Sequence, residues 1–265
     1  MEESTPELAA LIGKRFLQRR DVKAIQIPTG EYVPDHTSWK MRHLIDHIEG
    51  KHSYGHYLLD TDSKTRVFAF DIDLEKTGAW PKGYDDQDES RVIESVSFNP
   101  REAWRDRNHP ARNWMKYQLR MVAQKFASTA HERLGLPVAV AYSGSKGVHV
   151  YCFLDGPTEA KLAREAATLV IDWIGELEPK RGNSFFAFRD KDAWNGYPNL
   201  SIEVYPKQDT VTSGKGYSNL MRLPLGRNLK STDPTFFLDL KAPMGQFLPD
   251  GNPIQLLETG DPWRE

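Results

Sequence analysis

Cysteine is nearly absent from this chain of 265 residues, in which Cys152 is the single example. One cysteine cannot close a disulfide, and it cannot supply the several thiolates of a zinc ribbon or knuckle. We therefore expect no disulfide framework and no zinc. Proteins without disulfides are typical of reducing compartments, which indicates a cytoplasmic location.

Long hydrophobic runs are absent as well. No apolar stretch reaches the roughly 20 residues that span a bilayer, and the start of the chain lacks the pattern of a signal peptide, so we expect no membrane partner. Hydrophobic residues still make up 39% of the chain. That share suffices for a buried core in a single domain over residues 1–265, with two closely packed lobes and residues 227–265 wrapping around them.

Charge of one sign is not in excess either, because 35 lysines and arginines stand against 37 aspartates and glutamates. Binding to nucleic acid would therefore require a local basic face. The helix that apolar periodicity predicts from Ala111 to near Gly135 offers one. We predict that Arg112, Lys116 and Arg120 contact DNA, and the alternative is that they form an ordinary solvated helix face.

Asp71 and Asp73 share one face of a predicted strand over residues 66–74, because side chains on a strand alternate with a period of two. Two carboxylates this close repel each other and raise each other's pKa unless cations lie between them. Oxygen ligands without a nearby cysteine favour Mg²⁺ or Mn²⁺. A D-x-D pattern alone also fits a solvated strand end, so the metal site needs support from other residues.

Glu203 alternates in the same way out of an apolar strand over residues 200–205. On its own it would fit an edge-strand acid paired with a lysine. With Asp71 and Asp73 it completes a ligand set for two divalent ions in phosphoryl transfer, where one ion activates a 3′-hydroxyl and the other holds a triphosphate. We predict that these three acids are catalytic metal ligands.

The turn over residues 143–147 lies between predicted strands 138–142 and 148–154 and combines small residues with one positive charge. Small residues allow backbone N–H groups to approach an anion, serine hydroxyls can donate, and lysine adds charge. His149 follows on the next strand, where the alternative is a hydrogen-bonded core histidine. We predict a nucleotide-binding site made of Ser143, Ser145, Lys146, Gly147 and His149.

A second polar turn follows the strand that ends at residue 205. Residues 213–216, Ser-Gly-Lys-Gly, resemble the end of a P-loop, but they lack the serine or threonine that binds magnesium. Arg222 is suited to bind a phosphate through two parallel hydrogen bonds. We add Lys207, Asn219 and Arg222 to the predicted nucleotide site.

The remaining pattern predicts a β-hairpin over residues 24–33 and a helix that Thr37 caps and that ends near Gly50. It also predicts a second hairpin, made of residues 54–59 and 66–74. Strands and helices do not alternate as they do in a doubly wound fold. We expect an α+β fold with two sheets and helices on one side of each.

The three motifs occur in a recognisable order. A D-x-D strand, a Ser-Gly-x-Lys-Gly-x-His turn and an apolar strand with one acid resemble the three motifs of the archaeo-eukaryotic primase superfamily. They span residues 71 to 222, which is most of the chain. The turn is also similar to that of the polymerase domain of bacterial end-joining ligases. The sequence around Glu203 and Arg222 looks most like primase-polymerases of phages, plasmids and CRISPR-associated systems.

The resemblance implies an α+β catalytic core with an N-terminal αβ unit, a C-terminal RRM-like unit and an active site in the cleft between them. It implies that Asp71, Asp73 and Glu203 bind two Mg²⁺ or Mn²⁺ ions, although Glu203 replaces the commoner aspartate of the third motif. The implied substrates are dNTPs or NTPs. The implied partners are a single-stranded DNA template, a primer, and a helicase or another replication or CRISPR-associated component.

The activity that follows is DNA-templated nucleotidyl transfer by a primase-polymerase. Three alternatives stay open: a gap-filling or end-joining polymerase that extends without priming, an RRM-like nucleic-acid-binding module without catalysis, and a metal-dependent nuclease. A nuclease has no need of a triphosphate site, so the 143–147 turn argues against it. Some primases use a zinc module to start strands, and its absence makes extension a firmer expectation than priming.

Overall fold

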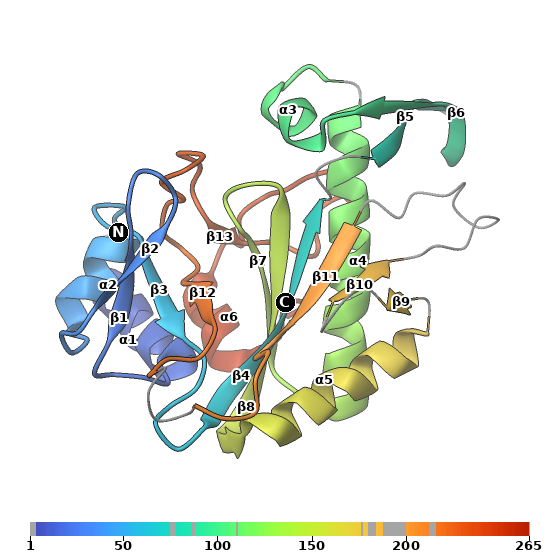
Figure 1. Ribbon diagram of the computed structural model, residues 1–265. Helices are drawn as coiled ribbons and strands as arrows, with labels where there is room; N and C mark the ends of the chain where they lie inside the picture. The colour runs from blue at the N-terminus through green and yellow to red at the C-terminus, as the bar shows by residue number, and fades with distance from the viewer. Residues whose placement is uncertain are drawn as a thin grey trace.

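The computed structural model describes residues 4–74, 78–85, 88–109, 111–175, 177–179, 184–187, 200–211 and 216–264 (Figure 1). The helices are α1 (Ser4–Phe16), α2 (Met41–Ile48), α3 (Pro100–Arg105), α4 (Ala111–Leu134), α5 (Ala160–Ile174) and α6 (Pro253–Thr259). The strands are β1 (Lys23–Gln26), β2 (Tyr32–Asp35), β3 (Tyr54–Tyr57), β4 (Lys64–Leu74), β5 (Gly78–Asp85), β6 (Asp88–Phe98), β7 (Val138–Tyr142), β8 (Gly147–Glu159), β9 (Leu177–Pro179), β10 (Ser184–Ala187), β11 (Leu200–Tyr205), β12 (Leu220–Arg222) and β13 (Phe236–Phe237).

The largest sheet among the described residues has the strand order β13-β7-β8-β4-β11-β10-β9. At its centre, β7 and β8 form the hairpin expected from the sequence, β8 pairs with β4, and β4 pairs with β11, all antiparallel. A smaller sheet has the order β12-β3-β1-β2, and β5 pairs with β6. This mixture of antiparallel sheets and helices confirms the α+β class, while the RRM-like nature of the C-terminal unit stays a prediction.

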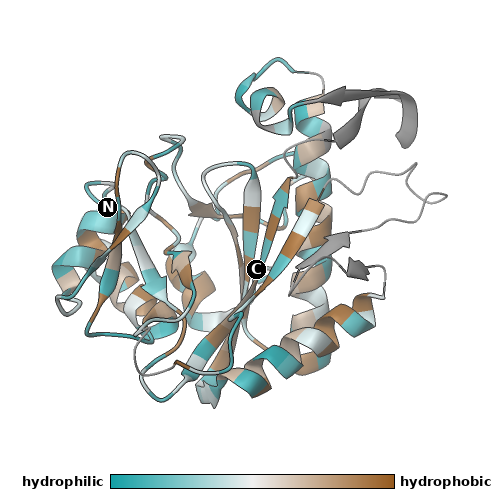
Figure 2. Ribbon diagram, viewed as in Figure 1, coloured by the Kyte–Doolittle hydropathy of each residue, from teal (hydrophilic) through white to brown (hydrophobic). Residues whose placement is uncertain are grey.

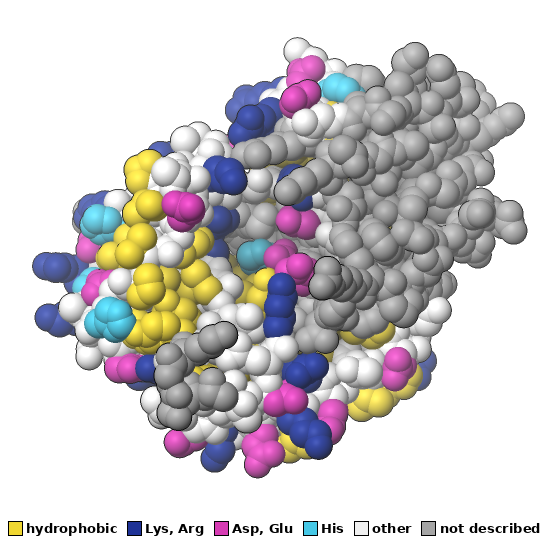
Figure 3. Space-filling view, viewed as in Figure 1, with side chains coloured by type: hydrophobic (Ala, Val, Ile, Leu, Met, Phe, Trp, Pro, Cys, Tyr) yellow, Lys and Arg dark blue, Asp and Glu magenta, His cyan; other side chains and the backbone are white. Residues whose placement is uncertain are grey.

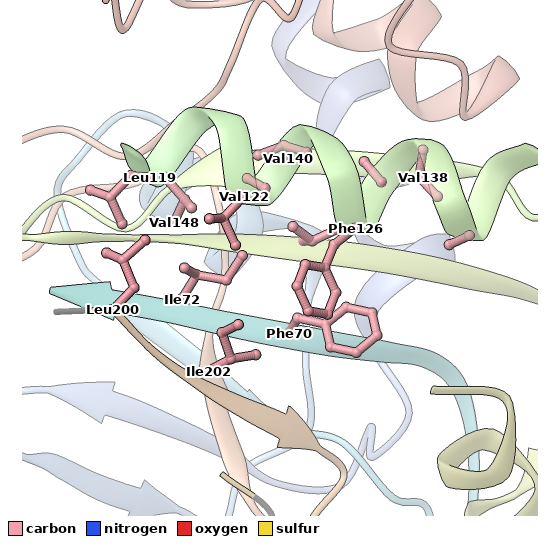
Figure 4. Packing of buried hydrophobic residues seen from close by; sticks show 14 of the residues in the cluster. Phe70, Ile72, Leu119, Val122, Phe126, Val138, Val140, Val148, Leu200 and Ile202 are labelled. Atoms are coloured by element: carbon pink, nitrogen blue, oxygen red, sulfur yellow. The ribbon is translucent and has the colours of Figure 1, made fainter. Parts of the chain in front are cut away.

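One face of the large sheet is covered by α4 and α5 (Figure 1). Phe70 and Ile72 of β4 point into this interface, where they meet Phe126 of α4 and Ile202 of β11, all fully buried (Figure 4). Apolar residues alternate with polar ones along β11 and at the end of β4 (Figure 2). Because of this alternation, packing of the core directs the intervening positions of β4, 71 and 73, to the opposite face.

The opposite face also carries helices, which differs from the expectation of helices on one side only. Phe16 of α1 packs edge-on against Tyr151 and Phe153 of β8, with ring centroids 4.9 and 5.3 Å apart. Leu256 and Leu257 of α6 belong to the same buried cluster. Such edge-to-face packing of aromatic rings is favourable beyond the area it buries, so α1 and α6 fix the second core beside the candidate site.

Two local predictions are wrong. The hairpin of residues 54–59 with 66–74 does not form, because β3 lies in the small sheet between β1 and β12, whereas β4 is central in the large sheet. Thr37 does not cap α2, whose N-cap is Lys40. The Thr37 hydroxyl instead accepts a hydrogen bond from Lys23 and donates to Asp35 at 2.8 Å. In the described part of the chain, no helix is both long and apolar enough to span a membrane.

Candidate active site

The predicted metal ligands lie on neighbouring strands of the large sheet. Across β11, β4 and β8, Glu203 lies directly opposite Asp71, and Asp71 lies directly opposite His149. Further along β4, Asp73 lies opposite Gly147. A Cβ atom at position 147 would approach an Asp73 carboxylate oxygen to 2.0 Å, so only glycine leaves room for that side chain. Acidic, basic and histidine side chains meet in the hollow at the centre of Figure 3.

The two aspartates differ in their electrostatic surroundings. Burial by itself raises the pKa of Asp71, but the charges of His149 and Lys146 outweigh it, and the pKa ends below its ordinary value. For Asp73, burial and then the charge of Asp71 raise the pKa to about 6. Lys146 Nζ lies 3.4 Å from Asp73, and His149 Nε2 lies 3.4 Å from Asp71. A divalent cation at this pair would offset the repulsion between the carboxylates.

Glu203 is engaged by residues that follow it in the chain. Its carboxylate accepts hydrogen bonds from Lys207 Nζ at 2.7 Å and from the Tyr205 hydroxyl at 3.0 Å. Among the residues with described positions, no three His, Cys, Asp or Glu side chains are already grouped as a metal site. The carboxylate oxygens of Asp71 and Asp73 fit a hard cation such as Mg²⁺ or Mn²⁺, and Glu203 could join them once Lys207 moves away.

Every carbonyl oxygen of the 143–147 turn accepts a hydrogen bond. The donors come from β4, β7, β12, the segment after residue 226 and the turn itself, so the turn is fixed from several sides at once. The pairs are Ser143 O with Arg222, Gly144 O with Asn228 and Ser231, Ser145 O with Tyr142, Lys146 O with the Leu74 N–H, and Gly147 O with the Ser143 N–H. With the carbonyl groups held, the turn cannot rotate them toward a bound anion.

Three successive N–H groups at the centre of the same turn are not paired in this way. Within the described residues, no acceptor is paired with the backbone N–H of Gly144, Ser145 or Lys146. Gly144 has a φ of 72°, in the left-handed region, and a Cβ there would come within 2.9 Å of Asn228 and Thr235. Successive N–H groups in a turn of this kind can bind an anion. The turn therefore presents donors of the kind that a phosphate requires, and its role in binding a nucleotide stays a prediction.

His149 is buried and belongs to the same hydrogen-bonded frame. Its Nδ1 lies 2.9 Å from the Tyr151 hydroxyl, which donates to the carbonyl of Arg222 at 3.3 Å. Burial raises the pKa of Tyr151, so this hydroxyl keeps its proton. The Tyr151 hydroxyl has one proton, which it donates to the Arg222 carbonyl, so it accepts a hydrogen bond from His149 Nδ1. In this orientation of the ring, His149 Nε2 faces Asp71. His149 thus resembles a hydrogen-bonded core histidine and still faces the carboxylates.

A cavity of about 320 Å³ lies in front of the carboxylates and the turn. Arg222 enters it from β12, with Nε donating to the Tyr32 hydroxyl at 2.8 Å and one terminal nitrogen donating to Ser143 O. Lys230 lies over Gly30, where a Cβ would come within 2.8 Å of its stem. The cavity brings together seven of the predicted site residues: Asp71, Asp73, Ser143, Ser145, Lys146, His149 and Arg222.

The residues that line this cavity and that sequence reasoning missed include Gln26, Tyr32, Asn228 and Lys230. The side-chain amides of Gln26 and Asn228 hydrogen-bond each other at 3.3 Å, and Asn228 also donates to Gly144 O at 3.2 Å. These residues come from the N-terminal hairpin and from the tail that was expected to wrap around the core. No local pattern marks them, because only the tertiary fold brings them to the turn.

Lys207 and Asn219 make contacts within the protein instead of lining this cavity. The side-chain oxygen of Asn219 accepts from the backbone N–H of Lys207 at 2.7 Å. The Lys207 ammonium pairs with Glu203 and lies 4.7 Å from the centre of the Tyr205 ring. These contacts shape the turn after β11, and a role of either residue in binding nucleotide stays a prediction.

The three basic residues predicted to contact DNA have different surroundings. Arg120 is fully buried, and its guanidinium donates to the carbonyl oxygens of Asp239, Pro243 and Gln246 at 2.8–2.9 Å. The predicted DNA contact of Arg120 is therefore wrong, because the C-terminal segment covers that side of α4. Arg112 and Lys116 are partly exposed, and their DNA contact remains a prediction.

A family model described as "TOTE conflict system, Archaeo-Eukaryotic Primase domain" matches residues 12–249. The chain belongs to this family. Membership confirms the resemblance of the three motifs and indicates chemistry of the primase and polymerase type. No curated protein matches the chain. Among solved structures, it is similar to the polymerase domain from Mycobacterium tuberculosis ligase D in complex with DNA, with 12% identity over 97% of this chain and 88% of that chain and a TM-score of 0.43.

Proposed function

We propose that this protein joins nucleoside triphosphates to a 3′-hydroxyl on a single-stranded DNA template. The observation that carries the proposal is the meeting of two unlike features in one cavity. Two carboxylates, of which Asp73 has a pKa raised to about 6, lie beside a turn whose carbonyl groups all accept hydrogen bonds. Within the described residues, three successive N–H groups of that turn, at positions 144–146, have no acceptor. Nucleotidyl transfer requires both features, since it needs metal ligands and donors for phosphate oxygens.

The residues of the cavity divide into two groups by charge. Lys146, Arg222 and Lys230 bring positive charge to one cavity, where they and the turn N–H groups are placed to bind the β- and γ-phosphates. Arg222 is held by Tyr32 and Ser143, so its guanidinium is oriented before a substrate arrives. An oriented donor loses little entropy when it binds a phosphate.

The proposed metal ligands are Asp71 and Asp73, joined by Glu203. Divalent ions held there would lower the pKa of the attacking hydroxyl and offset the charge of the triphosphate. Lys207 holds Glu203 in the present arrangement. We propose that the ammonium of Lys207 leaves Glu203 when metal and substrate bind.

Incubation with single-stranded DNA, labelled dNTPs or NTPs, and Mg²⁺ or Mn²⁺ tests the proposal, with and without an annealed primer. Template-dependent products are expected with a primer, and products without one would extend the proposal to strand initiation. Growth only from a primer would instead assign the gap-filling or end-joining type of activity. Strand cleavage, or binding that does not respond to metal, would contradict nucleotidyl transfer.

Substitution of the carboxylates links this activity to the site. Asp71→Ala and Asp73→Ala should each lower the rate about a hundredfold to a thousandfold or more, the range typical for loss of electrostatic stabilisation at a transferring phosphoryl group. Binding to single-stranded DNA should persist. Asp62→Ala is a matched control, because this acid lies in a turn of the described chain outside the cavity. A double variant of Asp71 and Asp73 that polymerises at the normal rate would exclude the proposed metal site.

A further inference from the structure

A second cavity of about 330 Å³ lies next to the first one. The two cavities share Ser145 and Lys146, so the 143–147 turn contributes to the walls of both. The second cavity is otherwise lined by residues from the end of α3, the start of α4 and the segment after residue 226. Three of its lining side chains are arginines, Arg105, Arg107 and Arg112.

The charge of this cavity is strongly positive. Arg105 and Arg107 are exposed, and no carboxylate of the described residues forms an ion pair with either of them. Among the described residues of the lining, Asp233 is the one acid, and it lies 3.4 Å from the Tyr142 hydroxyl. Guanidinium groups bind phosphate oxygens through two hydrogen bonds at once. The cavity therefore suits an anion with several oxygens.

Trp104 lies in the wall of this cavity, and its ring is too deeply buried to stack against a base. Trp104 is 6% exposed, and its indole N–H donates to the Tyr142 hydroxyl at 3.2 Å. That hydroxyl donates to Ser145 O at 2.7 Å, which joins Trp104 to the 143–147 turn. Arg112 is fixed from one side, with Nε donating to Trp104 O at 3.0 Å. A ligand would be recognised here by its phosphate groups.

We propose that this second cavity binds the phosphodiester backbone of the nucleic-acid strand close to its reacting end. The proposal rests on the proposed function, in which a strand and a triphosphate must meet at the carboxylates. The first cavity already offers Arg222 and Lys230 to the triphosphate. The adjoining cavity has a matching positive charge and reaches the same Lys146, so it is placed for the other phosphate-bearing reactant.

The test is the double variant Arg105→Ala, Arg107→Ala, which removes two exposed side chains and should fold normally. Affinity for a single-stranded oligonucleotide is measured over a range of salt concentrations, without metal or nucleotide, so that the readout does not depend on catalysis. We expect affinity to fall about tenfold or more at low salt. The slope of log affinity against log salt should shrink by roughly 0.7 for each phosphate that the variant no longer neutralises.

The matched control is Arg42→Ala, Lys161→Ala, which removes two positive charges from exposed positions on α2 and α5. The control should keep its oligonucleotide affinity, and nucleotide affinity should be unchanged in both double variants. If both double variants lost the same oligonucleotide affinity, the loss would come from the change in net charge, and the proposal would be overturned. Unchanged oligonucleotide affinity would overturn it as well, and so would a loss of nucleotide affinity alone, which would assign the cavity to a triphosphate.

Together with the incubation assay for nucleotide addition, this affinity measurement separates the strand-site proposal from the proposed function. If the protein adds no nucleotides but binds oligonucleotides through Arg105 and Arg107, the second cavity is a strand-binding site and the proposed nucleotidyl transfer is wrong. If the protein adds nucleotides but its oligonucleotide affinity does not depend on these arginines, the proposed function stands and the proposed strand site is wrong.

Discussion

Arg120 and Arg222 both donate hydrogen bonds to backbone carbonyls, but they differ in how much of the guanidinium group is accessible to a ligand. Arg120 donates to three carbonyls of the C-terminal segment and has no exposed surface. Arg222 donates to one carbonyl, Ser143 O, and to the Tyr32 hydroxyl, and it lines the cavity beside the carboxylates. A fully buried arginine can therefore join segments of a chain, whereas a partly exposed arginine can be oriented by the protein and still donate hydrogen bonds to a ligand.

The largest effect should follow from Arg120→Ala. The variant would lose three hydrogen bonds from a charged donor, and Gln246 O would be left without a described donor, whereas Asp239 O and Pro243 O keep backbone donors. Hydrogen bonds to charged groups contribute about 1.5–3 kcal/mol each, so the free energy of unfolding should fall by about 3 kcal/mol or more. Urea or thermal unfolding measures the change. Nucleotide and DNA affinities per folded molecule should stay normal. Selective loss of DNA affinity with normal stability would restore the predicted DNA contact.

Arg222→Ala should have the opposite profile. The loss of a charged hydrogen bond to phosphate, about 1.5–3 kcal/mol, should weaken nucleotide binding roughly tenfold to a hundredfold. Arg222→Lys should be impaired as well, because an ammonium cannot make the planar two-pronged contact. Calorimetric titration with nucleotide measures the affinity, with unfolding as the control. If Arg222→Ala lowered stability as much as Arg120→Ala and left nucleotide affinity intact, the contrast between the two arginines would disappear.

The smallest effect should come from Tyr32→Phe. This change removes the hydroxyl that accepts from Arg222 Nε at 2.8 Å and leaves the aromatic ring. A less firmly oriented guanidinium should weaken nucleotide binding about threefold to tenfold, as expected for one hydrogen bond. Combining Tyr32→Phe with Arg222→Ala should add little to the effect of Arg222→Ala. Fully additive effects would mean that Tyr32 acts on the nucleotide independently of Arg222.

The residues of the site that could be predicted from the sequence are those whose position depends on strand alternation. Asp71 and Asp73 share a face because Phe70 and Ile72 pack against α4, and this period is visible in the sequence itself. The 143–147 turn was recognisable because small residues and a lysine separate two apolar strands. Strand alternation and turn composition can be predicted without knowing which residues distant in the sequence pack against them.

Other features depended on partners far away in the chain. Residues 54–59 and 66–74 were predicted to pair because they are neighbours in sequence, but β3 pairs with β1 and β12 in another sheet. Arg120 was predicted to contact DNA because nothing near it in sequence reveals the segment 239–246 that covers it. Lys230 was missed for the same reason, since its place above Gly30 is a tertiary contact.

The segment after residue 226 carries none of the three motifs, yet Asn228 and Ser231 both donate to Gly144 O. A chain shortened before this segment would keep β4, β8 and β11 and every predicted carboxylate, but it would free the Gly144 carbonyl in the 143–147 turn. If the proposed function is right, such a fragment would keep its acidic residues and bind triphosphates less selectively. Substrate choice would then restrict which side chains residues 228 and 231 can carry, although neither position belongs to a motif.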